Sequence, residues 1–284
     1  MRIPGTFLCA LLSLQGHAEN QPGGSTPFRS EILKKIDTVI SNAIQKKKLP
    51  GGVLWLERNN EIYQKAYGRR ATVPAHEAMS LDTIFDAASL TKVIATTPCI
   101  LKLIEDSRIS LDDKASRFLP ELTGDPNKSR ITIRHLLTHT SGLLPGIRRG
   151  YDWRGRAAGI ALACSEPSTG HAGYDYRYSD INFILLGEIV RRISGKPLSV
   201  FAQETIFEPL QMKETFFLPE EPYVPRIAPT TLMDDGSVLR GVVHDPTAGA
   251  MDGEAGHAGL FTSCLLYTSP SPRDATLSRM PSSA

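Results

Sequence analysis

Residues 85–92 read FDAASLTK, and this stretch contains a serine and a lysine that together could carry out catalysis. Ser89 and Lys92 are spaced so that a helix beginning at Ser89 places both side chains on one face. The hydroxyl then lies beside helix N-terminal N–H groups that can stabilise an oxyanion. A buried lysine holds its proton less tightly and can serve as the base for that hydroxyl. The pattern therefore predicts a serine nucleophile, although a serine that only caps a helix has the same spacing.

A second motif, Tyr178-Ser179-Asp180, stands just before an apolar stretch at 181–193. A tyrosine phenol can relay a proton when a nearby cation stabilises its phenolate, and Asp180 can hold Lys92 in place by a hydrogen bond. The alternative is structural: Tyr178 packs at a loop corner and Asp180 caps the next helix.

A third motif lies in residues 256–261, which read GHAGLF. The small residues Ala258 and Gly259 would let a substrate approach the backbone closely. His257 beside them would bind a substrate carboxylate or assist proton transfer. The alternative is a structural histidine at the edge of a strand.

Taken in this order, the three motifs resemble those of the serine penicillin-recognising enzymes, which comprise class C beta-lactamases, DD-peptidases and related esterases. Residues 136–143 (LLTHTSGL), 178–187 (YSDINFILLG) and 243–245 (VHD) agree with this resemblance, which covers about residues 30–263. The family's motifs are S-x-x-K, Y-x-N and K-T-G or H-x-G. The resemblance implies a hydrolase that forms an acyl-enzyme.

The resemblance also implies a role for each motif residue. Ser89 is the acylated nucleophile and Lys92 its base partner, while Tyr178 protonates the leaving group and later activates water. The backbone N–H groups of Ser89 and Leu260 form the oxyanion hole, and Ala258 and Gly259 line the substrate-binding site.

Two positions depart from the family pattern. Asp180 stands where Asn is usual, and its carboxylate favours the charged form of Lys92, which weakens that lysine as a base. His257 stands where most relatives have Lys, and a neutral histidine attracts a substrate carboxylate less. Both departures favour peptidase or esterase chemistry over efficient beta-lactam hydrolysis.

The hydrophobic pattern predicts an α+β fold. Expected elements are a helix ending near Lys48, strands at 52–57 and 62–67 around a turn at Asn59-Asn60, helices at about 90–105, 181–193 and 199–207, mostly loop over 218–252, and a strand that starts at His257. The resemblance implies an antiparallel sheet flanked by helices, with a helical subdomain at roughly 100–245, in one domain over 28–263.

The two ends of the chain differ from the body. Residues 1–18 have the short positive start, apolar run and small residues of a secretory signal, which predicts a periplasmic or secreted protein. Residues 264–284 are rich in Ser, Pro and Arg and are expected to be a non-native tail. In the family, two further strands follow the strand that starts at His257. We therefore expect these strands to be missing here, which would leave that strand at an exposed sheet edge.

Composition excludes several function classes. The 284 residues carry 32 Lys and Arg and 30 Asp and Glu, a net charge of +2, which gives no reason to expect a nucleic-acid partner. No apolar run reaches the roughly 18 residues that span a bilayer, so association with a membrane is peripheral at most. His135 and His139 are spaced as zinc ligands on a helix can be, but the chain turns directly after them, and we expect no metal or cofactor.

The prediction is therefore an exported serine hydrolase that acts through Ser89 on D-alanyl peptides, small esters or amides, or slowly on beta-lactams. Its partner would be a small-molecule or peptidoglycan-peptide substrate, and the oligomeric state is left open. Two alternatives remain: a non-catalytic relative that binds the cell wall, and an inactive fragment.

Overall fold

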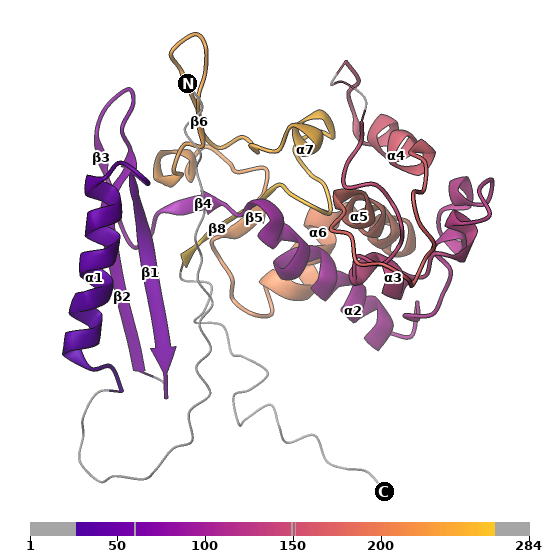
Figure 1. Cartoon of the computed structure of the whole chain (residues 1–284), viewed down its shortest axis with the longest axis horizontal. Coiled ribbons are helices and arrows are strands. Elements are labelled where there is room, and N and C mark those ends of the chain that lie inside the picture. The colour runs from indigo at the N-terminus through magenta and orange to yellow at the C-terminus, as the bar shows by residue number, and fades with distance from the viewer. Residues whose placement is uncertain (1–26, 60, 149, 151, 265–284) are drawn as a thin grey trace, which may run out of the picture. The chain divides into compact units, whose positions relative to one another are not determined.

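The computed structural model of the chain describes residues 27–59, 61–148, 150 and 152–264 (Figure 1). The chain divides into two compact units. One comprises the residues up to Thr83 together with Arg226–Arg240, and the other comprises Ile84–Pro225 and the residues from Gly241 onward. The predicted signal at 1–18 and tail residues 265–284 lie outside the described part of the chain.

The first unit is built from a helix and a β-hairpin. Helix α1 (Ser30–Gln45) is followed by β1 (Gly51–Arg58) and β2 (Glu61–Ala71), which pair antiparallel from Gly51 opposite Gly68 to Arg58 opposite Glu61. Asn59 has a φ of +52°, a left-handed conformation that asparagine adopts more readily than most residues. The helix and hairpin that the sequence predicts are confirmed.

Helix α1 lies along the hairpin (Figure 1) and is joined to it by one carboxylate. Asp37 accepts hydrogen bonds from Tyr63, Lys65 and Tyr67, at distances of 3.2, 2.6 and 2.5 Å. Because these three residues alternate along β2, they share one face of the strand. Two short pairings complete the strands of this unit: β3 (Glu77–Ala78) on β2, and β6 (Thr231–Leu232) with β7 (Val238–Leu239).

The second unit contains a separate three-stranded antiparallel sheet. Strand β8 (Leu260–Ser263) lies between β4 (Ile84–Asp86) and β5 (Thr215–Phe217). The exposed edge expected for the strand after His257 is therefore wrong, because β8 is paired on both sides and Leu260 is fully buried. The flanking strands have three residues each, too few to show an alternating pattern in the sequence.

Helix α5 (Asp180–Ser194) forms the centre of the second unit, and nearly all of its residues up to Val190 are buried. Ser179 caps its N-terminus and Gly195, with a φ of +77°, ends it. Around it pack α2 (Thr97–Glu105), α3 (Ile133–Leu137), α4 (Arg156–Ser165) and α6 (Leu198–Ala202) (Figure 1). Helix α7 (Pro246–Ala250) contacts α4. The mixed α+β class is thus confirmed.

The region expected as one helix from Leu90 to Glu105 is composite. A 3₁₀ turn over Ala88–Leu90 is followed by a π-helical turn over Lys92–Thr96 and then by α2. Such departures from α-helical geometry are frequent at functional sites. No helix in the described part of the chain is long and apolar enough to cross a membrane.

Candidate active site

Ser89 and Lys92 are in hydrogen-bond contact. Ser89 lies in the 3₁₀ turn and Lys92 opens the π-helical turn, so that Lys92 Nζ lies 3.0 Å from Ser89 Oγ. The lysine side chain is only 3% exposed. The structure therefore brings together the hydroxyl and the amine that the sequence motif predicts.

The turn that carries Ser89 is fixed by Asp86 at the end of β4. Asp86 accepts the N–H of Ala88 at 2.8 Å and the N–H of His244 at 2.8 Å, one on each carboxylate oxygen. Burial raises the pKa of Asp86 although both bonds oppose that shift. Ala88 has a φ of +46°, a conformation that L-residues rarely adopt, so the residue before Ser89 is held under backbone strain.

Lys92 Nζ contacts three oxygen atoms. Besides Ser89 Oγ it donates to the main-chain oxygen of His257 at 3.1 Å, and it forms an ion pair with Asp180 Oδ1 at 2.7 Å. Asp180 is the first residue of α5, as the motif before that helix predicts. The ion pair therefore brings the first and second motifs together.

Tyr178 stands at the open side of this cluster. Its ring centroid lies 4.9 Å from Lys92 Nζ, and the residue is 44% exposed. The structure therefore places the tyrosine of the second motif beside the cation and within reach of an incoming molecule.

The side chain of His257 does not lie where the sequence predicts it. The residue is 1% exposed, and its Nε2 donates to Asp245 Oδ1 at 2.8 Å. The Nδ1 atom of His257 is buried and has no hydrogen-bond partner among the residues that the structure describes. In this structure the ring is thus directed to Asp245, and His257 contributes its main-chain oxygen to Lys92. A role of this ring with a substrate carboxylate stays a prediction.

Asp245 anchors this histidine and the next helix together. Its Oδ1 also accepts the N–H of Ala248 at 2.7 Å, which caps α7. Burial alone would raise the pKa of Asp245, but the hydrogen bond and charge of His257, the bond from Ala248 and the charge of Lys92 together outweigh burial and hold the pKa below its usual range. The sequence contained this aspartate in the motif at 243–245, but no spacing rule connected it to His257.

The remaining residues of the third motif lie inside the fold. The N–H of Leu260 donates to Thr91 Oγ1 at 3.2 Å, so it is not a free oxyanion-hole donor in this structure. Ala258 and Gly259 are buried, and Gly259 has a φ of +115°. Their role in lining the substrate-binding site stays a prediction.

Two further contacts that the sequence did not reveal hold this segment against its neighbours. Thr96 Oγ1 donates to the main-chain oxygen of Gly256 at 2.7 Å. A Cβ atom on Gly256 would lie 2.0 Å from the main-chain oxygen of Phe183 in α5. Glycine is thus required where the turn before His257 meets α5.

His135 and His139, considered as zinc ligands, bind backbone groups instead. Thr132 N–H donates to His135 Nδ1 at 3.2 Å, and Ser179 N–H donates to His139 Nδ1 at 3.1 Å.

The Cys99 and Cys164 thiols are unpaired and buried, and burial raises their pKa values to about 12 and about 11.

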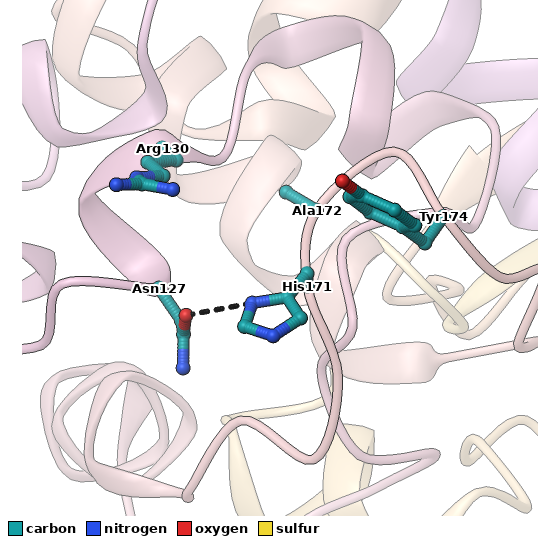
Figure 2. A pocket seen from close by; sticks show the side chains of 5 residues that line it. All are labelled: Asn127, Arg130, His171, Ala172 and Tyr174. Atoms are coloured by element: carbon teal, nitrogen blue, oxygen red, sulfur yellow. Dashed lines mark hydrogen bonds between the residues drawn. The ribbon is translucent and has the colours of Figure 1, made fainter.

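A pocket of about 280 Å³ also lies on the second unit (Figure 2). In it, His171 Nδ1 lies 3.0 Å from Asn127 Oδ1. The pocket is lined by Asn127, Arg130, His171, Ala172 and Tyr174, and by none of the predicted site residues.

Comparisons with known proteins agree with the resemblance. The family model described as Beta-lactamase matches residues 36–264. An N-acetylmuramyl-L-alanine amidase of Bacillus subtilis is 32% identical over 83% of this chain and 61% of that protein. Esterase EstB of Burkholderia gladioli is 32% identical over 68% of this chain and 53% of that protein. The chain thus spans between half and two thirds of these curated relatives.

The fold agrees as well. The crystal structure of a class C beta lactamase from Rhodobacter sphaeroides superposes with a TM-score of 0.67 at 21% identity, covering 82% of this chain and 62% of that one.

Proposed function

The chain belongs to the beta-lactamase family, and from this premise we propose that it is a serine hydrolase that works through an acyl-enzyme on Ser89. The observation that carries the proposal is the contact of 3.0 Å between Lys92 Nζ and Ser89 Oγ in a buried setting. A serine that merely caps a helix needs no buried lysine on its hydroxyl.

The first step is removal of the proton from Ser89. In its amine form, Lys92 Nζ accepts the hydroxyl proton as Ser89 Oγ attacks the substrate carbonyl. The carboxylate of Asp180, 2.7 Å from Nζ, then pairs with the ammonium group that forms.

The second step is departure of the leaving group. Tyr178, beside Lys92 and partly exposed, donates a proton to the leaving oxygen or nitrogen and later takes one from the water that hydrolyses the acyl-enzyme. The N–H of Ser89 supports the oxyanion. The N–H of Leu260 joins it once substrate binding has displaced the hydroxyl of Thr91.

The substrate we propose is a small ester or amide without a carboxylate next to the scissile bond. The ring of His257 is bound to Asp245 and the charge of Lys92 is paired with Asp180, so neither attracts a substrate anion. D-alanyl peptides and beta-lactams, which carry such a carboxylate, are then slower substrates. The name of the EstB relative, an esterase, supports this order.

The test compares substrates and variants in one series. The wild-type chain, Ser89→Ala and the control Ser129→Ala are assayed with p-nitrophenyl esters, a D-alanyl-D-alanine peptide and a chromogenic cephalosporin. The proposal predicts ester turnover that Ser89→Ala abolishes and Ser129→Ala keeps. Turnover that survives Ser89→Ala overturns it, and muropeptide binding without turnover supports the non-catalytic alternative.

We also propose export to the periplasm or beyond, on the signal-like sequence at 1–18. N-terminal sequencing of the protein recovered outside the cytoplasm tests this proposal. A new N-terminus near residue 19 supports export, and retention of Met1 in the cytoplasm contradicts it.

A further inference from the structure

We propose that His139 is a positioning residue that holds Tyr178 in place for proton transfer. The inference rests on the proposed function for the role of Tyr178. The contacts of His139 that hold Tyr178, which we call the clamp, rest on three independent observations. His139 lies in the segment at 136–143 that agrees with the resemblance to the penicillin-recognising enzymes, and the sequence analysis considered it only as a metal ligand.

The first two contacts fix the backbone on both sides of the tyrosine. The N–H of Arg177 donates to the main-chain oxygen of His139 at 2.8 Å. The N–H of Ser179 donates to His139 Nδ1 at 3.1 Å. The N–H groups of the two residues on either side of Tyr178 are thus bound by one residue, which leaves the tyrosine little freedom along the chain.

The third contact fixes the ring. The imidazole of His139 stacks on the phenol of Tyr178, with ring centroids 4.5 Å apart and an interplanar angle of 29°. Offset stacking at such distances is favourable and restricts the rotation of the side chain. The ring of His139 also contacts the buried Phe183 of α5, with centroids 5.2 Å apart and an interplanar angle of 40°, so His139 is itself supported by the core.

The imidazole is suited to this task because it remains neutral. Burial lowers the pKa of His139, and the positive charge of Lys92 lowers it further, against a smaller opposite effect of Asp180. A neutral ring keeps Nδ1 as an acceptor for Ser179 and adds no second cation next to Lys92. The tautomer with hydrogen on Nε2 follows from the bond at Nδ1.

The chain segment before Tyr178 is exposed, so the tyrosine depends on His139 for its position. Tyr174 and Tyr176, the alternate residues that precede Tyr178, are 81% and 71% exposed, and the ring of Tyr176 meets that of His139 edge-on, with centroids 6.0 Å apart. A phenol that delivers a proton must stay within hydrogen-bond reach of its target. Displacement by about 1 Å costs about 10²-fold in rate.

The experiment uses His139→Asn, with His135→Asn as the matched control. Asparagine tolerates the φ of +58° at position 139 and keeps an acceptor for Ser179, but it removes the stacked ring. His135 also accepts a backbone N–H through Nδ1, at 3.2 Å from Thr132, but it does not contact Tyr178. A general loss of stability therefore affects both variants, whereas loss of the clamp affects only one.

The primary readout is the ring-proton NMR signal of Tyr178, assigned by its loss in Tyr178→Phe. Loss of the ring current of His139 moves this signal in His139→Asn and leaves it in place in His135→Asn. The second readout is ester turnover, in which His139→Asn lowers kcat by roughly 10²-fold and changes KM much less. A folded His139→Asn whose Tyr178 signal and kcat match the wild type overturns the inference.

The NMR readout separates this inference from the proposed function. If the wild-type chain shows no turnover dependent on Ser89, the proposed function fails, and the Tyr178 signal still decides whether His139 holds the ring. If His139→Asn fails to fold, His139→Gln replaces it in both measurements, with the same two outcomes.

Discussion

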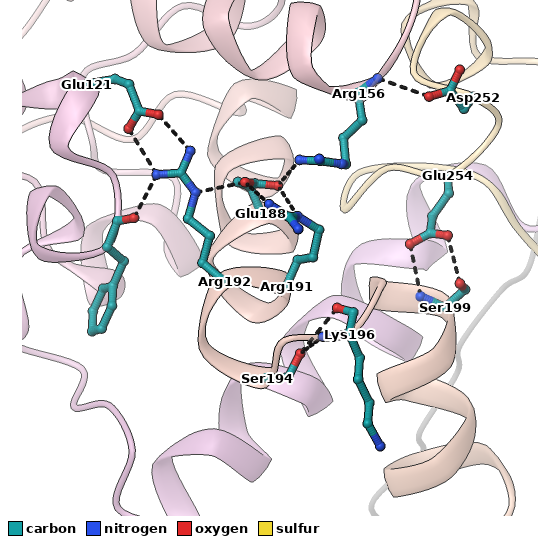
Figure 3. A network of polar contacts seen from close by, with 11 residues as sticks. Glu121, Arg156, Glu188, Arg191, Arg192, Ser194, Lys196, Ser199, Asp252 and Glu254 are labelled. Carbon is teal, nitrogen blue, oxygen red and sulfur yellow. Dashed lines mark hydrogen bonds and ion pairs between the residues drawn. The ribbon is translucent and has the colours of Figure 1, made fainter.

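Replacing Glu188 with Gln tests how strongly α5, which carries Asp180 at its first turn, is held in the second unit. The carboxylate of Glu188 has a side-chain exposure of 1% and binds three arginines (Figure 3). Arg156 donates at 2.7 Å, Arg191 at 3.0 and 3.1 Å, and Arg192 at 2.8 Å. A glutamine of the same shape removes the charge and directs an amide N–H toward one of these donors.

The expected loss is about 3 kcal/mol in the free energy of unfolding. Removing one partner of a buried ion pair costs about 3–5 kcal/mol. The lower figure applies because the arginine side chains are between 28% and 41% exposed and can regain water. Against a total stability of about 5–15 kcal/mol, this loss is large and easily measured.

The assay is urea unfolding of the wild type, Glu188→Gln and the control Glu121→Gln. Glu121 binds Arg192 in the same network but is 42% exposed, so its replacement should cost less than about 1 kcal/mol. Equal losses in the two variants, or a Glu188→Gln loss below about 1 kcal/mol, would refute the argument from burial.

The comparison of the wild type with Glu188→Gln also predicts how the free energy of unfolding depends on pH. Burial alone would raise the pKa of Glu188, but the bonds from Arg191 and Arg192 and the charge of Arg156 outweigh burial and hold it below 4.5. A carboxyl group whose pKa is lower in the folded than in the unfolded state stabilises the folded state. This stabilisation is complete at pH values above the unfolded-state pKa and is lost as the pH falls through the folded-state pKa. The difference between wild type and Glu188→Gln should therefore be constant near neutral pH and shrink below about pH 4.5.

Three further predictions concern the site itself. In urea unfolding, Gly256→Ala should destabilise by more than about 1–3 kcal/mol, because its Cβ would lie 2.0 Å from a main-chain oxygen. The control Gly249→Ala, whose Cβ would have its nearest atom at 4.0 Å, should be neutral or mildly stabilising. Asp245→Ala should cost about 2–4 kcal/mol through loss of a helix cap and of the bond from His257, and Asp245→Asn clearly less; equal costs would contradict the assigned contacts. Tyr178→Phe should lower ester turnover by about 10²–10⁴-fold with an unchanged unfolding curve, and full turnover would remove the tyrosine from the mechanism.

The larger elements of the fold could be predicted because their patterns are long. The apolar spacing of α1 and α5 and the turn at Asn59 identify two helices and a hairpin without knowledge of any contact. Strands β4 and β5 could not be predicted, since three residues carry no periodic signal and their partner β8 is far away in the chain. The edge position expected for β8 came from the family resemblance, which does not reveal these two short strands as its partners.

The site was predictable where its geometry is local or begins a helix. Ser89 and Lys92 meet because they are three residues apart in one helical segment, and Asp180 at the start of α5 meets Lys92. The orientation of His257 was not predictable, because it depends on a bond to Asp245 in a loop-rich segment without periodicity. His139 was considered only as a metal ligand, since its stacking on Tyr178 depends on the tertiary fold.

The most direct test of the account is the position of the covalent adduct. The chain is treated with a fluorophosphonate probe, digested and mapped by mass spectrometry, alongside Ser89→Ala and Ser129→Ala. The account predicts one modified peptide, which contains Ser89, with labelling that Ser89→Ala abolishes and Ser129→Ala retains. An adduct on another residue, or labelling that persists in Ser89→Ala, would contradict the assignment of Ser89 as the nucleophile.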